Sequence, residues 1–237
     1  MARTIIIGDV HGCSYELDQL LCLIGWTRRD RVYFVGDLLS RGPDPKGVLD
    51  LFYATGGQAV RGNHENSLLA WKKATTKKSK PTPIGRSHRE VVAVLRGRDW
   101  KMLRSLPLFL DLPEHGLRIV HAGVVPGVPI EDQPLRALIK MRYLGKNNEP
   151  VEMDGRTRWT ARYVGPPHIV FGHDAILGLQ LHRWATGLDT GAVYGGQLTA
   201  MVLEMGQEVP PAPSARRSVL FSVPALKQYS RIKGLYR

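Results

Sequence analysis

The chain has 237 residues, of which 43% are hydrophobic and 23% charged, and its formal net charge is +12. A chain with this length and composition buries a substantial core, so disorder throughout is excluded. The positive charge favours anionic partners such as nucleotides, polyphosphate, nucleic acid or acidic membrane surfaces, and it does not choose among them.

The two cysteines, Cys13 and Cys22, fall within one predicted turn and helix. We expect reduced thiols there rather than a disulfide or a cysteine-based zinc site. A strand is predicted directly after residue 3, and no run of about 18 apolar residues occurs. We therefore expect a cytoplasmic protein without a membrane partner.

The first predicted strand, residues 4–7, leads into Gly8-Asp9-Val10-His11-Gly12. Apolar residues at helical spacing then predict a helix over 14–24, and a second buried strand over 32–35 leads into Gly36-Asp37. The two strands and the helix between them form a βαβ unit. Because the carboxyl ends of parallel strands share one edge of a sheet, this unit delivers two aspartates to the same edge.

The same pattern occurs a third time. Asp44 and Pro45 are suited to cap and begin a helix that stops at Gly56-Gly57. A short strand over 58–60 then runs into Arg61-Gly62-Asn63-His64-Glu65. Three successive strands therefore end in a glycine turn and side chains that can bind metal or phosphate.

Residues 71–104 form a basic insert, with six lysines and five arginines but only Glu90 and Asp99 as acidic residues, a net charge of +9. We expect a loop from Lys72 to Pro83, and a capping box beginning at Ser87 that opens a helix. The insert is either a solvated charged segment or a surface that contacts polyanions such as polyphosphate or nucleic acid.

Strands are predicted over 106–110 and 117–120, the second of which delivers His121, and a helix over 135–144 carries Arg142. A strand over 168–171 leads into Gly172-His173. The alternating residues 197–203 suggest a second sheet with a partly exposed face. We expect one domain over 1–237, ending in a basic tail over 210–237.

Six side chains that directly follow predicted strands are oxygen or imidazole donors: Asp9, His11, Asp37, Asn63, His121 and His173. This donor set suits Mn, Fe, Zn, Co or Mg and includes no thiolate. Six ligands are too many for one open catalytic metal. They fit two metals that share Asp37, with Asp9 and His11 on one and Asn63, His121 and His173 on the other. Such a pair activates a bridging water for attack at phosphorus.

The ordered motifs resemble those of the calcineurin-like metallophosphoesterases, within the phosphoprotein phosphatase superfamily. The motifs are Gly8-Asp9-Val10-His11-Gly12, Gly36-Asp37 with Arg41-Gly42, Arg61-Gly62-Asn63-His64-Glu65, His121-Ala122-Gly123 and Gly172-His173. Among members of the superfamily, the chain is most similar to the ApaH-like phosphatases, relatives of the symmetrical diadenosine tetraphosphatases. The resemblance implies an α/β fold, a four-layer αββα sandwich with two mixed sheets.

By the same resemblance, the chain is a phosphohydrolase with two divalent metal ions, manganese being our first expectation. It would cleave phosphoanhydrides in polyanionic substrates such as dinucleoside polyphosphates, nucleotide caps or polyphosphate, by direct attack of a metal-bridging hydroxide. His64 would be the general acid and Arg41 would bind phosphate oxygens. We take Arg142 as the second phosphate-binding arginine, over Arg158 or Arg162.

One residue departs from the pattern of the related protein phosphatases. Ser40 stands where those enzymes usually have an aspartate that orients the catalytic histidine. The departure favours the tetraphosphatase side and leaves the partner of His64 unidentified.

Two alternatives remain open at this point. One is hydrolysis of phosphoserine or phosphothreonine in proteins, and the other is a nucleic-acid-binding protein with a relict site. We interpret His88, His115, His168 and His182 as surface or packing residues rather than ligands, and Asp189 as a residue that could support His173.

Overall fold

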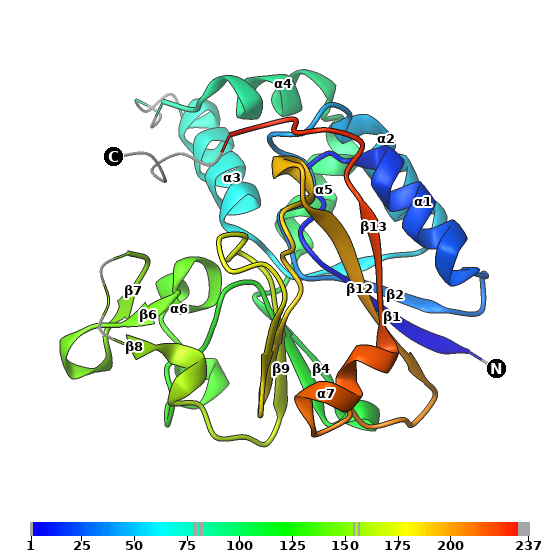
Figure 1. The fold of residues 1–237 in the computed structure, drawn as a ribbon. Coiled ribbons are helices and arrows are strands. Elements are labelled where there is room, and N and C mark those ends of the chain that lie inside the picture. The colour runs from blue at the N-terminus through cyan, green and yellow to red at the C-terminus, as the bar shows by residue number, and fades with distance from the viewer. Residues whose placement is uncertain (1, 78–79, 81–82, 154, 156, 232–237) are drawn as a thin grey trace.

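Two five-stranded sheets form the centre of the molecule (Figure 1). The computed structural model describes residues 2–77, 80, 83–153, 155 and 157–231. Both sheets mix parallel and antiparallel neighbours, and helices cover their outer faces. The predicted α/β class and four-layer αββα sandwich are confirmed.

The first sheet has the order β13-β12-β1-β2-β3, in which β1, β2 and β3 are parallel and β12 and β13 complete an antiparallel side. In β1, Ile5 and Ile7 pack toward the helices, whereas Ile6 packs toward the second sheet, because side chains alternate along a strand. The strands are β1 (Arg3–Ile7), β2 (Arg31–Phe34), β3 (Gln58–Ala59), β12 (Gln197–Glu204) and β13 (Leu220–Pro224).

The second sheet has the order β10-β11-β9-β5-β4, and β5, β9 and β11 are parallel within it. Its inner face contributes Ile119 and Val170 to the core between the sheets, and its outer face packs Phe171 against Trp159. The strands are β4 (Phe109–Leu112), β5 (Leu117–Val120), β9 (His168–Phe171), β10 (Gln180–His182) and β11 (Ala185–Gly187).

Helices cover the two outer faces unequally. Five helices pack on the outer face of the first sheet, whereas α6 packs on the outer face of the second sheet. The five helices each contribute a buried side chain to the same core: Leu17 of α1, Phe52 of α2, Leu68 of α3, Val91 of α4 and Leu103 of α5. The helices are α1 (Ser14–Ile24), α2 (Pro45–Ala54), α3 (Asn63–Thr76), α4 (Arg86–Val94), α5 (Gly97–Ser105), α6 (Leu135–Lys140) and α7 (Pro213–Arg216). The described helices are too short or too polar to span a lipid bilayer.

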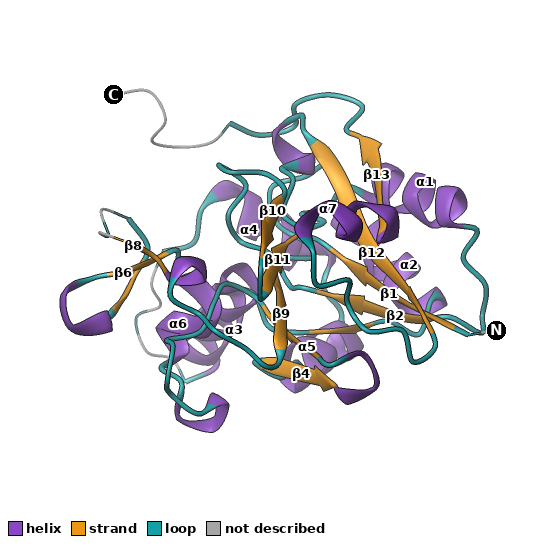
Figure 2. Cartoon of the chain, turned by 60° about the horizontal axis from the view of Figure 1, so that its bottom comes forward, coloured by secondary structure: helices purple, strands orange, loops and turns teal. Residues whose placement is uncertain are grey.

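A small third sheet lies at the edge of the molecule, away from the two large sheets (Figure 2). It has the order β7-β6-β8, formed by β6 (Tyr143–Leu144), β7 (Pro150–Val151) and β8 (Thr157–Arg158). The sequence did not predict it, because two-residue strands carry no readable periodicity. Its position matters because Arg142 directly precedes β6.

Three local predictions are wrong. The helix expected over 135–144 ends at Lys140, so Arg142 lies outside it. The loop expected from Lys72 begins later, because α3 continues to Thr76. Helix α4 begins at Arg86 after Gly85, so Ser87 lies inside the helix and does not cap it. Residues 78, 79, 81 and 82 of the expected loop lie outside the described residues.

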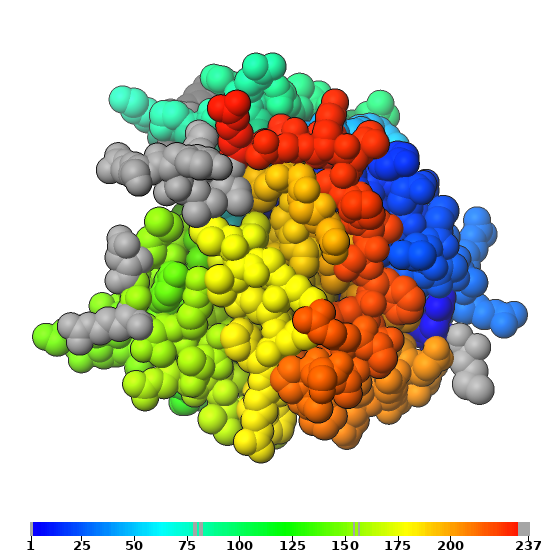
Figure 3. Space-filling model, in the orientation of Figure 1, coloured from blue at the N-terminus to red at the C-terminus, as the bar shows by residue number. Residues whose placement is uncertain are grey.

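Strand β12 differs most from its expected place. It pairs with β1 in the first sheet and is buried from Leu198 to Leu203, so it has no exposed face. The basic tail continues this sheet as β13 and then crosses the top of the molecule, between α4 and the residues near 190, as the red segment in Figure 3 shows. Residues 232–237 of the tail lie outside the described residues.

Candidate active site

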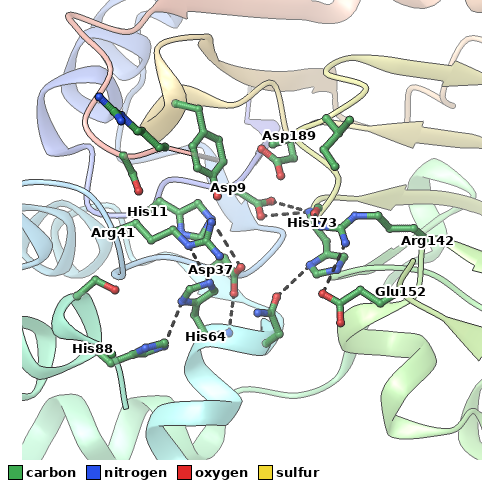
Figure 4. Close-up of a pocket in the computed structure, with 18 of the residues that line it drawn as sticks. Asp9, His11, Asp37, Arg41, His64, His88, Arg142, Glu152, His173 and Asp189 are labelled. Atoms are coloured by element: carbon green, nitrogen blue, oxygen red, sulfur yellow. Dashed lines mark hydrogen bonds and ion pairs between the residues drawn. The ribbon is translucent and has the colours of Figure 1, made fainter. Parts of the chain in front are cut away.

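The predicted metal ligands meet where strands of the two sheets end. Asp9 and His11 follow β1, Asp37 follows β2, His121 follows β5 and His173 follows β9. These side chains are almost completely buried. The parallel pairs β1 with β2 and β5 with β9 bring their carboxyl ends to one edge. Asp37 lies between His64 on one side and His173 on the other (Figure 4).

The backbone of these loops adopts a conformation that side chains rarely tolerate. The φ angles are 50° at His11, 50° at Asp37, 85° at Arg41 and 68° at His173. Left-handed backbone at residues other than glycine concentrates at functional sites, where the surrounding structure imposes it. The strained backbone at these four residues therefore indicates a functional site independently of the types of side chain found there.

Two glycines allow the ligand loops to approach each other. A Cβ atom at Gly62 would lie 2.1 Å from Asp37 Oδ1, and one at Gly172 would lie 1.9 Å from Asp9 Oδ1. Both distances are far shorter than a van der Waals contact, so glycine is required at each position for these aspartates to sit where they do.

Two sets of donor atoms share the Asp37 carboxylate. His11, Asp37 and His64 offer atoms within 4.8 Å of one another, and so do Asp37, His121 and His173. We call these the first and second donor sets. Asp37 Oδ2 lies 3.7 Å from His11 Nε2 and 3.5 Å from His121 Nε2.

Asn63 adds an oxygen to the second donor set. Its Oδ1 atom lies 3.1 Å from His121 Nε2 and 2.9 Å from His173 Nδ1. The other ring nitrogens are held by carbonyl groups: His121 Nδ1 lies 2.8 Å from Val35 O and His173 Nε2 lies 3.1 Å from Lys140 O. A proton on each carbonyl-bound nitrogen leaves the facing nitrogen free as a ligand.

The surroundings of His11 and Asp9 both indicate that the site can bind cations. His11 Nδ1 is buried and has no hydrogen-bond partner among the described residues. Burial, together with the neighbouring Asp189 carboxylate, raises the pKa of Asp9 well above its usual range. Buried carboxylates and imidazoles that crowd in this way fit hard or borderline divalent ions.

Asp9 is the predicted ligand whose geometry differs most from the expectation. It is not part of either donor set; its two oxygens accept the backbone N–H of His173, at 3.2 and 3.1 Å. His64, which the resemblance assigns to acid catalysis, joins the first set instead. Asp9 does line the same cavity as Asp37 and His173.

Glu65 belongs to the motif over residues 61–65, but the motif did not predict a role for it. Its buried carboxylate accepts the backbone N–H groups of Asp37 at 2.9 Å, Leu38 at 3.0 Å and Gly62 at 3.0 Å. Burial raises its pKa to about 7, and the charge of Asp37 adds to this effect. Glu65 therefore ties the loop after β2 to the start of α3.

His64 lies between an arginine and a second histidine. Arg41 Nε donates to His64 Nε2 at 3.1 Å, and the Arg41 guanidinium lies 5.5 Å from the centre of the Tyr194 ring. On its other side, His64 Nδ1 lies 3.1 Å from His88 Nε2. Burial holds the pKa of His64 well below its usual range, and the cationic forms of its neighbours His11 and Arg41 act in the same direction.

His88 is half-buried, and its ring stacks on that of His64. It lines the cavity beside His64, although it belongs to neither donor set. The other three histidines interpreted as surface or packing residues are structural: His115 contacts Thr4 and Gln207, His168 contacts Thr186, and His182 contacts Gln180.

The arginines considered for phosphate binding lie in different surroundings. Arg142 lines the cavity, with Nη2 donating to His173 O at 2.9 Å and Nε lying 3.2 Å from Asp174 Oδ1. Arg158 pairs with the other oxygen of Asp174, and its guanidinium lies 4.4 Å from the centre of the Tyr143 ring. Arg162 lines a separate, smaller cavity.

The main cavity has a volume of about 430 Å³ and passes over both donor sets. At one end it is lined by His88 and other residues around the start of α4, and at the other by Arg142 and Glu152. Asp189 also lines it and accepts the Gly191 N–H at 3.1 Å. A cavity of this size suits a small molecule of nucleotide dimensions.

Comparisons with known proteins agree with this geometry. The family model Calcineurin-like phosphoesterase matches residues 2–187. A symmetrical bis(5'-nucleosyl)-tetraphosphatase from Shewanella sp. (strain MR-7) is 34% identical, over 86% of this chain and 95% of the relative. The asymmetrical bis(5'-nucleosyl)-tetraphosphatase PrpE of Oceanobacillus iheyensis is 29% identical, over 82% of this chain and 86% of the relative.

Solved structures give the same family. A crystal structure provisionally described as a diadenosine tetraphosphatase superposes with a TM-score of 0.78 at 32% identity, covering 94% of this chain and 93% of the other. A protein serine/threonine phosphatase from Saccharomyces cerevisiae shares the fold at 17% identity, with a TM-score of 0.58, covering 94% of this chain and 79% of the other. The chain belongs to the calcineurin-like phosphoesterase family of metal-dependent hydrolases that act on phosphate esters and anhydrides.

Proposed function

We propose that this enzyme hydrolyses a phosphoanhydride bond in dinucleoside polyphosphates such as diadenosine tetraphosphate. Its relatives named as bis(5'-nucleosyl)-tetraphosphatases align over more than four fifths of the chain. The observation that carries the proposal is the shared Asp37 at the centre of a cavity with an arginine on each side, because a cleavable phosphate in a longer polyphosphate chain needs cationic contacts in both directions.

The two donor sets support two divalent cations that share Asp37, with manganese as our first choice among Mn, Fe, Zn, Co and Mg. When bound, such ions polarise phosphate oxygens and lower the pKa of a coordinated water. His11 would hold the first ion, and Asn63, His121 and His173 the second. Asp9 lines the same cavity and would complete the first set.

Arg41 and Arg142 would bind phosphate oxygens on the two sides of the cleaved bond. Guanidinium groups suit this task because they donate two parallel hydrogen bonds and keep their charge. The two arginines lie on opposite sides of Asp37 in the cavity (Figure 4). Asp174 and the carbonyl oxygen of His173 hold Arg142 in place before substrate arrives.

His64 would donate the proton that the leaving phosphate oxygen takes up. Burial lowers its pKa, so the ring is neutral before substrate binds. The negative charge of a bound polyphosphate favours the protonated ring, which ties protonation of His64 to the presence of substrate. The proton would leave from Nε2, the nitrogen that faces Arg41 and the cavity.

A substrate panel tests the proposal. Purified enzyme with added Mn²⁺ is given diadenosine tetraphosphate, inorganic polyphosphate, a capped nucleotide and a phosphoserine peptide, and the rates are compared. We expect the dinucleoside substrate to be preferred, and chromatography of its products to show two molecules of ADP for symmetrical cleavage or ATP plus AMP for asymmetrical cleavage. Full chelation of divalent ions is expected to abolish turnover.

A strong preference for the phosphopeptide would overturn the proposal in favour of a protein phosphatase. Steeply salt-dependent binding to RNA or DNA without turnover of any substrate would instead favour a nucleic-acid-binding protein. Undiminished activity after exhaustive chelation would exclude the metal sites as described.

A further inference from the structure

The ring of a catalytic histidine needs a partner on the nitrogen that does not face the substrate. That partner selects the tautomer and the orientation of the ring, and so decides which nitrogen exchanges a proton with substrate. At position 40 this chain has a serine, and the Ser40 hydroxyl is buried without a hydrogen-bond partner among the described residues. Ser40 therefore does not hold His64.

The donor positions around His64 determine where its proton lies. A guanidinium Nε always carries a hydrogen, so Arg41 must be the donor and His64 Nε2 the acceptor in their 3.1 Å contact. The neutral ring then carries its proton on Nδ1. Nδ1 lies 3.1 Å from His88 Nε2, so it donates and His88 accepts.

The two rings are held in a well-defined relation. Their centres are 4.8 Å apart and their planes differ by 19°. His88 lies in the first turns of α4, and His64 lies at the start of α3. Val91 of α4 and Leu68 of α3 are buried in the same hydrophobic cluster, so the packing of the two helices fixes the distance between the histidines.

We propose that His88 is the positioning residue of His64, an imidazole in the place of the expected carboxylate. His88 accepts the Nδ1 proton and so keeps Nε2 turned toward Arg41 and the cavity. This inference rests on the proposed function of His64 as the proton donor, but it concerns how His64 is held and not which substrate is cleaved.

Three variants test the proposal. His88→Ala removes the acceptor, whereas His88→Gln puts an amide oxygen near the former position of Nε2. His182→Ala is the matched control, because His182 pairs with Gln180 and does not line the cavity. We expect His88→Ala to lower kcat about 10- to 100-fold with little change in KM, His88→Gln to recover most of the loss, and His182→Ala to behave as the parent enzyme.

Two readouts separate positioning from general destabilisation. The loss in His88→Ala is expected to be larger for phenyl phosphate than for p-nitrophenyl phosphate, since the poorer leaving group depends more on proton donation. In ¹⁵N-histidine NMR of the Mg²⁺-loaded protein, the His64 ring, identified by comparison with His64→Gln, is expected to lose its Nδ1–H tautomer preference in His88→Ala and to keep it in His88→Gln.

The outcomes distinguish this inference from the proposed function. If the parent enzyme turns over aryl phosphates but not diadenosine tetraphosphate, the substrate proposal fails, and the variants still test His88. Full activity of His88→Ala, or unchanged His64 ring signals in that variant, would overturn the positioning role. If His88→Ala unfolds below the assay temperature, the test rests on His88→Gln alone. A loss of kcat in His88→Gln as large as that in His64→Gln, together with altered His64 ring signals, would overturn the positioning role.

Discussion

The cavity has two unlike walls. One wall is made of the loops that follow β1, β2, β5 and β9, which carry buried donors on strained backbone. The other is made of the first turn of α4, Tyr194 and the segment at Ser230 and Arg231, whose side chains are more exposed. The candidate metal ligands therefore lie on the first wall, and the side chains of the second wall are freer to adjust to a bound substrate.

The difference follows from how each wall is attached. The strand-end loops are held by the hydrogen bonds of the sheets, so their positions are set within the register of β1 with β2 and β5 with β9. Helix α4 is attached mainly through packed side chains such as Val91. We expect substitutions on the strand-end wall to abolish turnover and those on the α4 wall to reduce it by degrees.

The largest effect is expected at Asp37, which both donor sets share. Asp37→Asn removes a negative charge from between the histidines and should lower kcat by at least about 10³-fold, with loss of bound metal. Turnover of diadenosine tetraphosphate and elemental analysis of the purified variant measure both effects. Asp111→Asn, which removes an exposed carboxylate paired with Arg118, is the control and should keep full activity. Retention of a tenth of the activity by Asp37→Asn would contradict the shared-ligand interpretation.

A smaller effect is expected at Arg142, which lies on the second-sheet side of the cavity. Arg142→Lys keeps the charge but loses the paired donors, so KM for the dinucleoside substrate should rise about tenfold, with a smaller change in kcat. Steady-state kinetics measure the split. Arg162→Lys is the matched change at an arginine of the smaller cavity and should leave KM unaltered. If Arg162→Lys had the larger effect, the choice of Arg142 would be wrong.

The α4 wall is expected to act through its charge. Arg86 and Arg89 are exposed residues of α4, and replacing both with glutamate should raise KM about two- to fivefold at low salt. The effect should vanish at high ionic strength, because exposed charges are screened there. Arg28→Glu with Arg29→Glu makes the same charge change before β2, at the opposite edge of the sheet from the site. Equal KM changes in the two double variants would show that only net charge matters.

The smallest effect on activity is expected at Asp30, far from both walls, where the expected change is in stability. Asp30 accepts bonds from Arg3 and Thr27. Burial alone would raise the pKa of Asp30, but these bonds outweigh it and lower the pKa to about 2. Asp30→Asn should therefore lower the free energy of unfolding by about 1–3 kcal/mol at pH 7 and leave kcat unchanged.

The sign of its pH dependence follows from the lowered pKa. The stabilisation is fully present above the unfolded pKa of about 3.9, and it is lost as the pH falls toward 2. Denaturant unfolding of parent and Asp30→Asn should thus give a difference that is constant from pH 7 to 5 and shrinks below pH 4. A difference that grew on acidification would contradict the ion pair as the cause.

The strand-end wall was largely predictable from the sequence. Short buried runs that end in glycine and a polar residue predict both a strand and the edge at which its last side chains lie, because parallel strands deliver their carboxyl ends to one edge. Asp37, Asn63, His121 and His173 come together in the structure for this reason. The motifs also predicted the family and the αββα sandwich.

The α4 wall was decided by tertiary structure. His88 gave no local signal, because its role depends on the packing of α4 beside α3 and on the unpaired Ser40, neither of which has a periodicity in the sequence. In the same way, β12 joined the first sheet rather than the second, because its position depends on pairing with β1, almost 200 residues earlier in the chain. The positions of side chains at strand ends follow from the local sequence of each strand and its turn, whereas contacts between distant helices and strands exist only once the core has formed.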